Sequence, residues 1–106
     1  MLDFTWTAGE KKLARKVFDN AVQLELANFI SEFKAKAIAV QNVEAIWHIK
    51  DWLDKREQEI DAEFDFRYSQ IIRVFANLVH TGRLDLNELA GLAEEKVQAI
   101  KLISEL

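Results

Sequence analysis

The chain has no cysteine and no proline, and only three of its 106 residues are glycine. Without cysteine it has no disulfide, no thiol nucleophile and no thiolate metal site. Sheet proteins need frequent turns built from Gly, Pro, Asn and Asp, whereas residues 10–81 contain neither glycine nor proline. These absences favour an all-helical protein.

Two further absences bear on location and partners. The first residues have neither a basic start nor a long apolar run, and no segment approaches the roughly 18 consecutive apolar residues of a membrane span. We therefore expect a soluble, cytoplasmic protein. Fourteen basic against eighteen acidic residues give a net charge of −4. Nucleic-acid binding relies on clustered Lys and Arg, so it is disfavoured.

Half of the residues are hydrophobic, enough to form a core, and their spacing is helical. Thr7 and Glu10 have the spacing of a capping box and predict a helix over residues 8–40, after a loosely ordered segment 1–7. Its apolar face recurs every three or four residues: Val22, Leu26, Phe29, Phe33, Ala37 and Val40.

A second helix is predicted over residues 43–81, with Asn42 as its N-cap and Gly82 as its C-terminal cap. A helix continuous through Asn42 is the alternative. Its main apolar face comprises Ile46, Ile49, Leu53, Ile60, Phe64, Ile71, Phe75 and Leu78.

Asp85 and Glu88 form another capping signature, which predicts a short helix over 86–92. A final helix is expected over 94–105. We see no internal repeat, so residues 1–106 are expected to form one helical domain, a long hairpin with a small C-terminal helical head.

The predicted length of the second helix bears on assembly. A helix of about 38 residues is roughly 57 Å long, whereas a compact domain of this size is only about 33 Å across. Trp47 and Trp52 also lie on opposite sides of the apolar face. We therefore expect a homodimer that pairs through this helix.

The acidic segment 51–65 allows two interpretations. Carboxylates of a helical bundle can hold two metal ions, but such sites pair Glu with His three residues later, and neither His48 nor His80 has that partner. A solvated acidic face with ion pairs along the helix is the simpler interpretation. The two histidines are expected at the surface, and nothing predicts an enzyme.

Trp47, Asp51 and Asp54 share one helical face. A large aromatic side chain beside acids is typical of an interface anchor with a polar rim. A tryptophan half-buried inside the intramolecular hairpin is the equal alternative.

Several segments, taken in order, resemble the fluorescence recovery protein family of cyanobacteria. The resemblance covers residues 17–106 and is strongest over 46–76. The segments that carry it are Trp47-His48-Ile49-Lys50-Asp51-Trp52-Leu53, Glu59-Ile60-Asp61, Phe64-Asp65-Phe66-Arg67, Val74-Phe75-Ala76 and Asp85-Leu86-Asn87-Glu88-Leu89 followed by Leu92.

The resemblance implies a non-enzymatic regulator without a cofactor, which binds itself and the C-terminal domain of the photoactivated orange carotenoid protein. It would speed that protein's return to the resting orange form, so that phycobilisome fluorescence recovers. It implies a dimer interface at Trp47, Lys50, Asp51, Asp54 and Glu57, and partner contacts in the head at Arg73 and Phe75.

Three of these positions depart from the family pattern. Lys50 stands where His is usual, Arg73 where Phe is common, and Glu57 where an Arg would answer Asp51 across the dimer. Glu57 would therefore place two acids, Glu57 and Asp51, together across the dimer, unless Lys50 or Lys55 of the other chain pairs with Glu57. Arg56 is the other candidate partner for Asp51. An adaptor of the same fold with another protein partner is the alternative function, and a carboxylate-bridged metal enzyme is a third.

Overall fold

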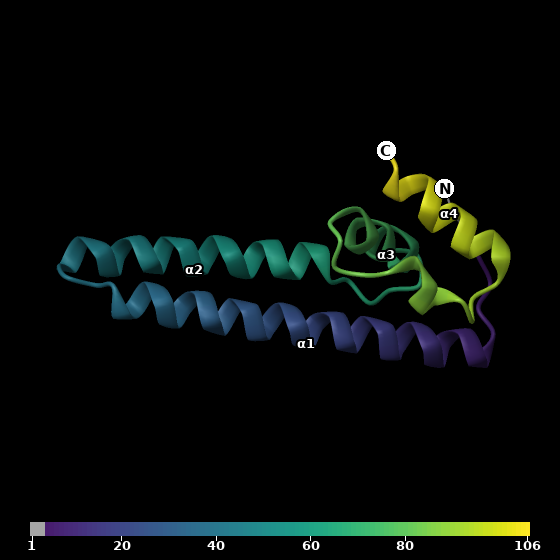
Figure 1. Ribbon diagram of the computed structural model, residues 1–106, viewed down its shortest axis with the longest axis horizontal. Coiled ribbons are helices and arrows are strands. Elements are labelled where there is room, and N and C mark those ends of the chain that lie inside the picture. Colours follow the sequence, from purple (N-terminus) through teal and green to yellow (C-terminus); the bar gives the residue numbers. More distant parts are fainter. Residues whose placement is uncertain (1–3) are drawn as a thin grey trace.

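The computed structural model describes residues 4–106 and contains only helices there (Figure 1). They are α1 (Ala8–Ile38), α2 (Val43–Glu63), α3 (Ile71–His80), the short 3₁₀ helix η1 (Leu86–Leu89) and α4 (Glu94–Ser104). The molecule measures 53 × 23 × 22 Å, and its radius of gyration of 16.8 Å exceeds the roughly 13 Å of a compact domain of this size. It is therefore elongated. We call residues 22–63 the arm and residues 64–106, with the first half of α1, the head.

The start of α1 is the predicted capping box. The backbone N–H of Glu10 donates to Thr7 Oγ1 at 3.1 Å, and that of Thr7 donates to Glu10 Oε1 at 3.0 Å. Of the segment expected to be loosely ordered, residues 1–3 lie outside the described residues, while Phe4 and Trp6 pack against the core.

The hairpin turn lies where the weak N-cap signal indicated. Asn42 has an extended backbone, and its Oδ1 accepts from the N–H of Ala45 at 2.9 Å. A continuous helix through Asn42 is therefore wrong. The first helix ends at Ile38, two residues earlier than predicted.

The predicted second helix over 43–81 is wrong, because α2 ends at Glu63 and α3 begins only at Ile71. Residues 64–70 leave the helix to bring Phe64 and Phe66 against Phe18, with ring centroids 5.9 and 4.9 Å apart. In a continued helix these two side chains would point in nearly opposite directions, about 160° apart, so they could not both pack there. The prediction of a dimer from the length of this helix therefore loses its basis, because the helix is shorter than predicted.

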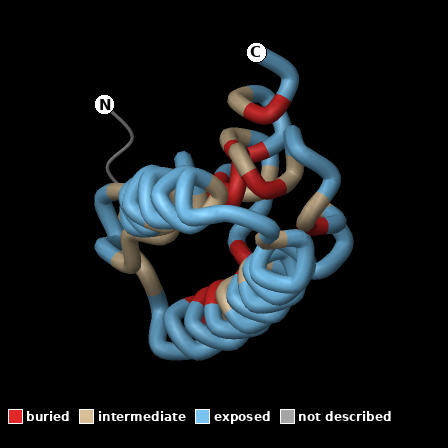
Figure 2. The backbone as a smooth tube through the Cα atoms, turned by 90° about the vertical axis from the view of Figure 1, so that its left-hand side faces the viewer, coloured by how far each residue is buried: buried red, intermediate tan, exposed pale blue. Residues whose placement is uncertain are grey.

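The core lies in the head, where α3 supplies four of the six largest fully buried side chains of the described residues. Figure 2, viewed from the tip of the arm, shows buried residues gathered there and along the first half of α1. The buried hydrophobic residues are Ala14, Val17, Phe18, Ala21, Ile71, Ile72, Val74, Phe75, Ala76, Leu78, Leu84, Leu89, Leu92 and Ile100.

The ends of the head helices follow the sequence signals with small shifts. Gly82 has φ +73° and ends α3, a conformation that glycine adopts without steric cost. The capping box of Asp85 and Glu88 forms as predicted, but the helix that it starts is 3₁₀ and ends at Leu89, not at residue 92. α4 ends at Ser104, one residue earlier than predicted.

The arm has little core of its own. α2 has 21 residues, all described, and none is buried. In α1 the last buried residue is Glu25. Large hydrophobic side chains remain exposed along both helices: Leu24, Leu26, Ile30, Phe33, Ile38, Val43, Ile46 and Trp47. The arm therefore carries apolar surface that a single copy of the chain leaves uncovered.

Candidate functional site

The five residues predicted at a dimer interface all lie on the exposed surface of α2. Trp47 is 59% exposed, so its ring is not inside the hairpin, and the intramolecular interpretation is wrong for this residue. Lys50 Nζ lies 3.9 Å from Asp54 Oδ2 one turn further along the helix.

Beside these residues a groove runs between the two helices of the arm. We call it the arm groove. It has a volume of about 520 Å³ and continues into a second, entirely apolar depression of about 210 Å³. The groove and the depression share Phe29 and Leu53, and their remaining lining residues are Leu26, Ile30, Phe33, Asp54, Glu57, Ile60 and Asp61.

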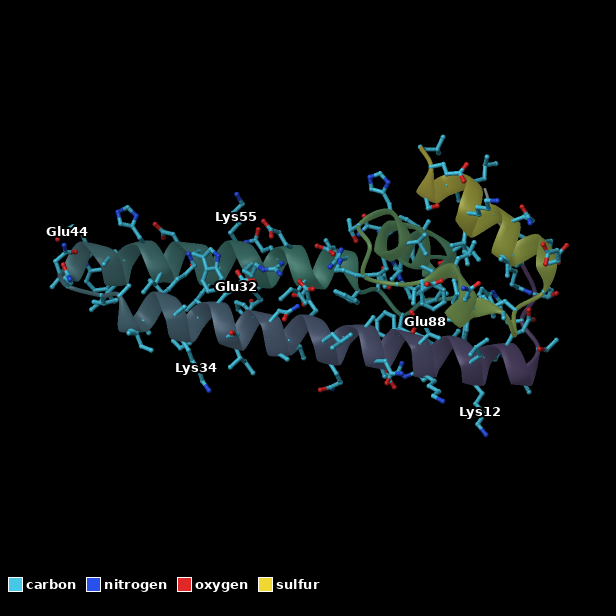
Figure 3. The ribbon with its side chains drawn as sticks, in the orientation of Figure 1. Lys12, Glu32, Lys34, Glu44, Lys55 and Glu88 are labelled. Atoms are coloured by element: carbon cyan, nitrogen blue, oxygen red, sulfur yellow. The ribbon has the colours of Figure 1, made fainter. Side chains whose placement is uncertain are left out.

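Figure 3 shows three lysines on the outer sides of the two long helices. Lys12 and Lys34 project from α1 away from α2, and Lys55 projects from α2 away from α1. Lys55 therefore lies outside the arm groove, which Asp54, Glu57 and Asp61 flank. The groove has an apolar floor and an acidic margin.

In the head, the two predicted partner contacts have different environments. Arg73 is exposed, and its Nε donates to Gln70 Oε1 at 2.9 Å. It lines a depression of about 190 Å³ with Ala76, Asn77, His80, Ile103 and Leu106. Phe75 is completely buried, so its prediction as a contact residue is corrected: it packs in the core of the head.

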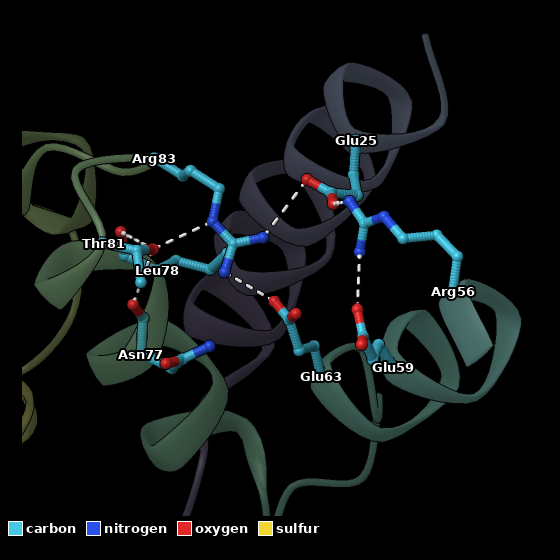
Figure 4. Close-up of polar contacts among 8 residues, drawn as sticks. All are labelled: Glu25, Arg56, Glu59, Glu63, Asn77, Leu78, Thr81 and Arg83. Carbon is cyan, nitrogen blue, oxygen red and sulfur yellow. Dashed lines mark hydrogen bonds and ion pairs between the residues drawn. The ribbon is translucent and has the colours of Figure 1, made fainter. Parts of the chain in front are cut away.

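A network of ion pairs joins the arm to the head at the centre of the molecule (Figure 4). The buried carboxylate of Glu25 accepts from Arg56 of α2 and, at 3.2 Å, from Nη1 of Arg83 in the turn after α3. Nη2 of Arg83 also donates to Glu63 at 2.5 Å, and Nη1 of Arg56 lies 3.5 Å from Glu59. We call these five residues the junction network.

Arg56 was a candidate to answer Asp51 across a dimer, but its guanidinium points instead to α1. Partial burial lowers its pKa, and the hydrogen bond to Glu25 with the nearby charges of Glu25, Glu32 and Glu59 outweighs this, so the pKa of Arg56 is above its ordinary value. The sequence analysis missed this network, since Glu25 and Arg56 are 31 positions apart.

The remaining candidates from the sequence are the two histidines. His48 is exposed near the tip of the arm, and His80 Nδ1 lies 2.8 Å from the carbonyl oxygen of Ser104. Across residues 4–106, no three His, Asp or Glu side chains are placed to hold a metal ion. No helix in that part of the chain is long and apolar enough to cross a membrane.

Residues 6–104 match the family model described as "Photoprotection regulator fluorescence recovery protein". The chain belongs to the fluorescence recovery protein family. It is therefore a photoprotection regulator and not an enzyme.

Sequence and structural similarity to individual family members supports this assignment. The fluorescence recovery protein of Synechocystis is 34% identical over 101 residues, which cover 95% of this chain and 93% of the relative. The solved structure of that protein and that of the Fremyella diplosiphon fluorescence recovery protein each have a TM-score of 0.91, at 33% and 31% identity. In both cases the match covers 96% of this chain and 100% of the other. The arm and head arrangement is therefore the family fold.

Proposed function

We propose that the protein binds the photoactivated orange carotenoid protein, through that protein's C-terminal domain, and accelerates its return to the resting orange form. Fluorescence of the phycobilisome then recovers. Family membership over residues 6–104 is the observation that carries this proposal, and the exposed depression beside Arg73 is the head surface that supports it.

The thermodynamic requirement is simple. A binding protein shifts a conformational equilibrium only by the difference in its affinity for the two conformations. The protein must therefore bind the orange arrangement, or the path that leads to it, more tightly than the photoactivated one.

We further propose that the regulator is a homodimer. The uncovered apolar side chains of the arm support this, because two helices with no buried residue between Leu26 and Glu63 are marginal unless another surface covers them. A second copy would supply the other half of a four-helix arrangement.

Adding the protein to photoactivated carotenoid protein in the dark tests the function, with absorbance following the red-to-orange conversion. We expect acceleration by the wild type and a larger effect from Arg73→Phe. Phe at this position gives the exposed depression an apolar anchor, and one such anchor is worth about 2 kcal/mol, or roughly thirty-fold in affinity.

Lys12→Phe is the matched control, since it also replaces an exposed cation with Phe but lies on the outer side of α1 (Figure 3). Equal rates for the two variants would mean that Arg73 does not face the partner. Failure of both the wild type and Arg73→Phe to accelerate conversion, in folded protein, would refute the proposed function. An adaptor with a different protein partner would then be the better interpretation, because Arg73 places a cation at the margin of the head depression.

A further inference from the structure

The first part of α1 carries a cluster of cations on its solvent-exposed side. We call it the basic face, and it comprises Lys11, Lys12, Arg15 and Lys16. All four residues are exposed, and their spacing places them on one side of the helix. Lys12 projects from α1 away from α2 (Figure 3). The basic face shares no residue with the arm groove or with the head depression beside Arg73, so it is a separate surface.

The basic face conflicts with its local surroundings. The whole chain has a net charge of −4, yet residues 11–16 contain four cations and no acid. Lys11 and Lys12 directly follow the first turn of α1, where the positive end of the helix dipole disfavours cations. The acid of that turn, Glu10, is already paired with the buried Lys96. Local conflicts of this kind are expected at functional sites.

Within the described part of the chain, the basic face has little charge compensation. Arg15 forms an ion pair from its Nε to Asp19 Oδ2 at 3.2 Å. Lys11, Lys12 and Lys16 form no ion pair with any of residues 4–106. A carboxylate from another molecule can therefore pair with these lysines without displacing an ion pair among those residues.

A row of aromatic rings lies beside the basic face and contacts two of its cations. The rings of Trp6, Tyr68 and Phe66 follow one another with centroids 5.5 Å apart at each step. Arg15 Cζ lies 4.4 Å from the centroid of the Phe66 ring. Lys11 Nζ lies 5.4 Å from the centroid of the Tyr68 ring. Tyr68 is 37% exposed, so a bound molecule can contact this ring together with the cations.

Arg15 is the cation of the basic face that is best oriented for a carboxylate. Phe66 lies against its guanidinium and Asp19 accepts from its Nε, so the plane and the direction of the group are both held. Neither Nη of Arg15 has a hydrogen-bond partner among residues 4–106. The two Nη groups of a guanidinium can bind one carboxylate through two parallel hydrogen bonds. A side chain that is already held loses less conformational freedom when it binds.

The size and composition of the basic face indicate the kind of partner. Residues 11–16 span only about 8 Å along the helix, and Asp19 follows one turn beyond Arg15. A nucleic-acid strand is bound along a longer row of cations, and here it would meet Asp19 and the net negative charge of the chain. Arginine and tyrosine side by side are instead typical of the centre of a protein interface. The basic face therefore fits a short acidic segment of a protein.

We propose that the basic face and the ring of Tyr68 bind an acidic segment of another protein, with one carboxylate held by the two Nη groups of Arg15. Lys11, Lys12 and Lys16 pair with neighbouring acids of the same segment. The inference goes beyond the proposed function, because this surface is separate from the head surface assigned to the carotenoid protein. The regulator then has a second protein partner with a binding surface of its own.

A short fluorescein-labelled peptide of alternating Glu and Ala tests this site, with fluorescence anisotropy at low salt measuring the dissociation constant. Arg15→Gln should raise the constant about fivefold, which corresponds to one exposed ion pair of about 1 kcal/mol. Arg15→Lys should show most of the same loss, because lysine keeps the charge but lacks the two Nη groups. Lys12→Gln/Lys16→Gln, which leaves Arg15 and its ring contact in place, should raise the constant by a similar factor.

Lys34→Gln is the matched control, since it removes an exposed cation of the same helix outside the basic face (Figure 3). It should leave the dissociation constant within about twofold of the wild type. Nuclear magnetic resonance of the wild type with the peptide should show the largest amide shifts over residues 11–19 and 66–68. Far-UV circular dichroism confirms that each variant is folded. The measurement uses no carotenoid protein, so its result is independent of the proposed function.

Two kinds of result would overturn the proposal. Absence of peptide binding by the wild type at low salt, or equal constants for Arg15→Gln and Lys34→Gln, would show that the basic face is not the site. Tighter binding of a single-stranded oligothymidylate, or of phosphatidylglycerol vesicles, than of the peptide at equal charge would make phosphate the ligand and overturn the assignment to a protein partner.

Discussion

Glu10 shows how one side chain serves two elements. Its carboxylate accepts from the N–H of Thr7 in the capping box and from the N–H of Ala93 at 2.8 Å. It also pairs with Nζ of Lys96, which is 2% exposed. Hydrogen bonds from Thr7, Ala93 and then Lys96 lower the pKa of Glu10 from 4.5 to about 2. One carboxylate therefore caps α1 and holds α4 to it.

Because folding lowers the pKa of Glu10, its contribution to stability is complete above pH 4.5 and is lost as the pH falls towards about 2. We expect Glu10→Gln to lower the free energy of unfolding at pH 7, and the difference from the wild type to shrink between pH 4.5 and 2. Urea unfolding at several pH values measures this. Glu95→Gln, an exposed change in α4 next to Lys96, should have little effect at any pH. A constant difference across this range would contradict the role of the carboxylate charge.

At the scale of helices, short sequence motifs correctly predicted the helix ends that depend only on neighbouring residues. The capping boxes at Thr7 and Asp85, the N-cap at Asn42 and the left-handed Gly82 are all found in the structure. The break at 64–70 contains no glycine, no proline and no strong cap. It exists because Phe64 and Phe66 pack on Phe18, about 46 positions earlier, a contact that no helical pattern reveals.

For the candidate site too, local spacing predicted some features and missed those that depend on tertiary contacts. The helical period placed Trp47, Asp51 and Asp54 correctly on one exposed face. For Phe75 the period could not distinguish a core residue from a surface anchor, because both are apolar and recur with the same spacing. The arm groove requires α1 and α2 in their relative register, so sequence alone did not predict it.

The junction network makes a prediction about how the elements are held together. Arg83 is the only residue of the network that contacts both Glu25 of α1 and Glu63 of α2. Arg83→Gln should lower the free energy of unfolding by about 1–3 kcal/mol, because it leaves the buried Glu25 with Arg56 alone. Chemical denaturation measures the loss.

Arg67→Gln is the control for that variant. Arg67 pairs with Asp65, but its side chain is 69% exposed, and pairs at such positions contribute about 0–1 kcal/mol. Equal losses for the two variants would mean that the junction network has no special role in joining arm and head.

At the scale of the whole molecule, the buried core and the uncovered apolar surface lie in different parts. The head has a core of fourteen buried hydrophobic residues, whereas no residue of α2, described throughout, is buried. The head should therefore be stable by itself, and the arm should depend on what covers it.

Light scattering at micromolar concentration should accordingly give about twice the chain mass of 12.3 kDa. Trp47→Ala should weaken association by at least about 2 kcal/mol, or roughly thirty-fold, if Trp47 is a central anchor. Leu24→Ala removes a similarly exposed apolar side chain that does not line the arm groove, so it should leave the mass unchanged. An unaltered dimer with Trp47→Ala would place the interface on another face.

The positions of the three tryptophans have a consequence for spectroscopy. Trp6 lies 5.5 Å from Tyr68 with Lys96 over its ring in the head, and Trp52 lies 5.3 Å from Phe29 inside the hairpin. Trp47 faces solvent. Variants that keep one indole at a time would give separate emission signals for the head, for closure of the hairpin and for association of two chains. A single fluorophore of the natural chain could therefore assign each step of unfolding to a place in the molecule without an attached dye.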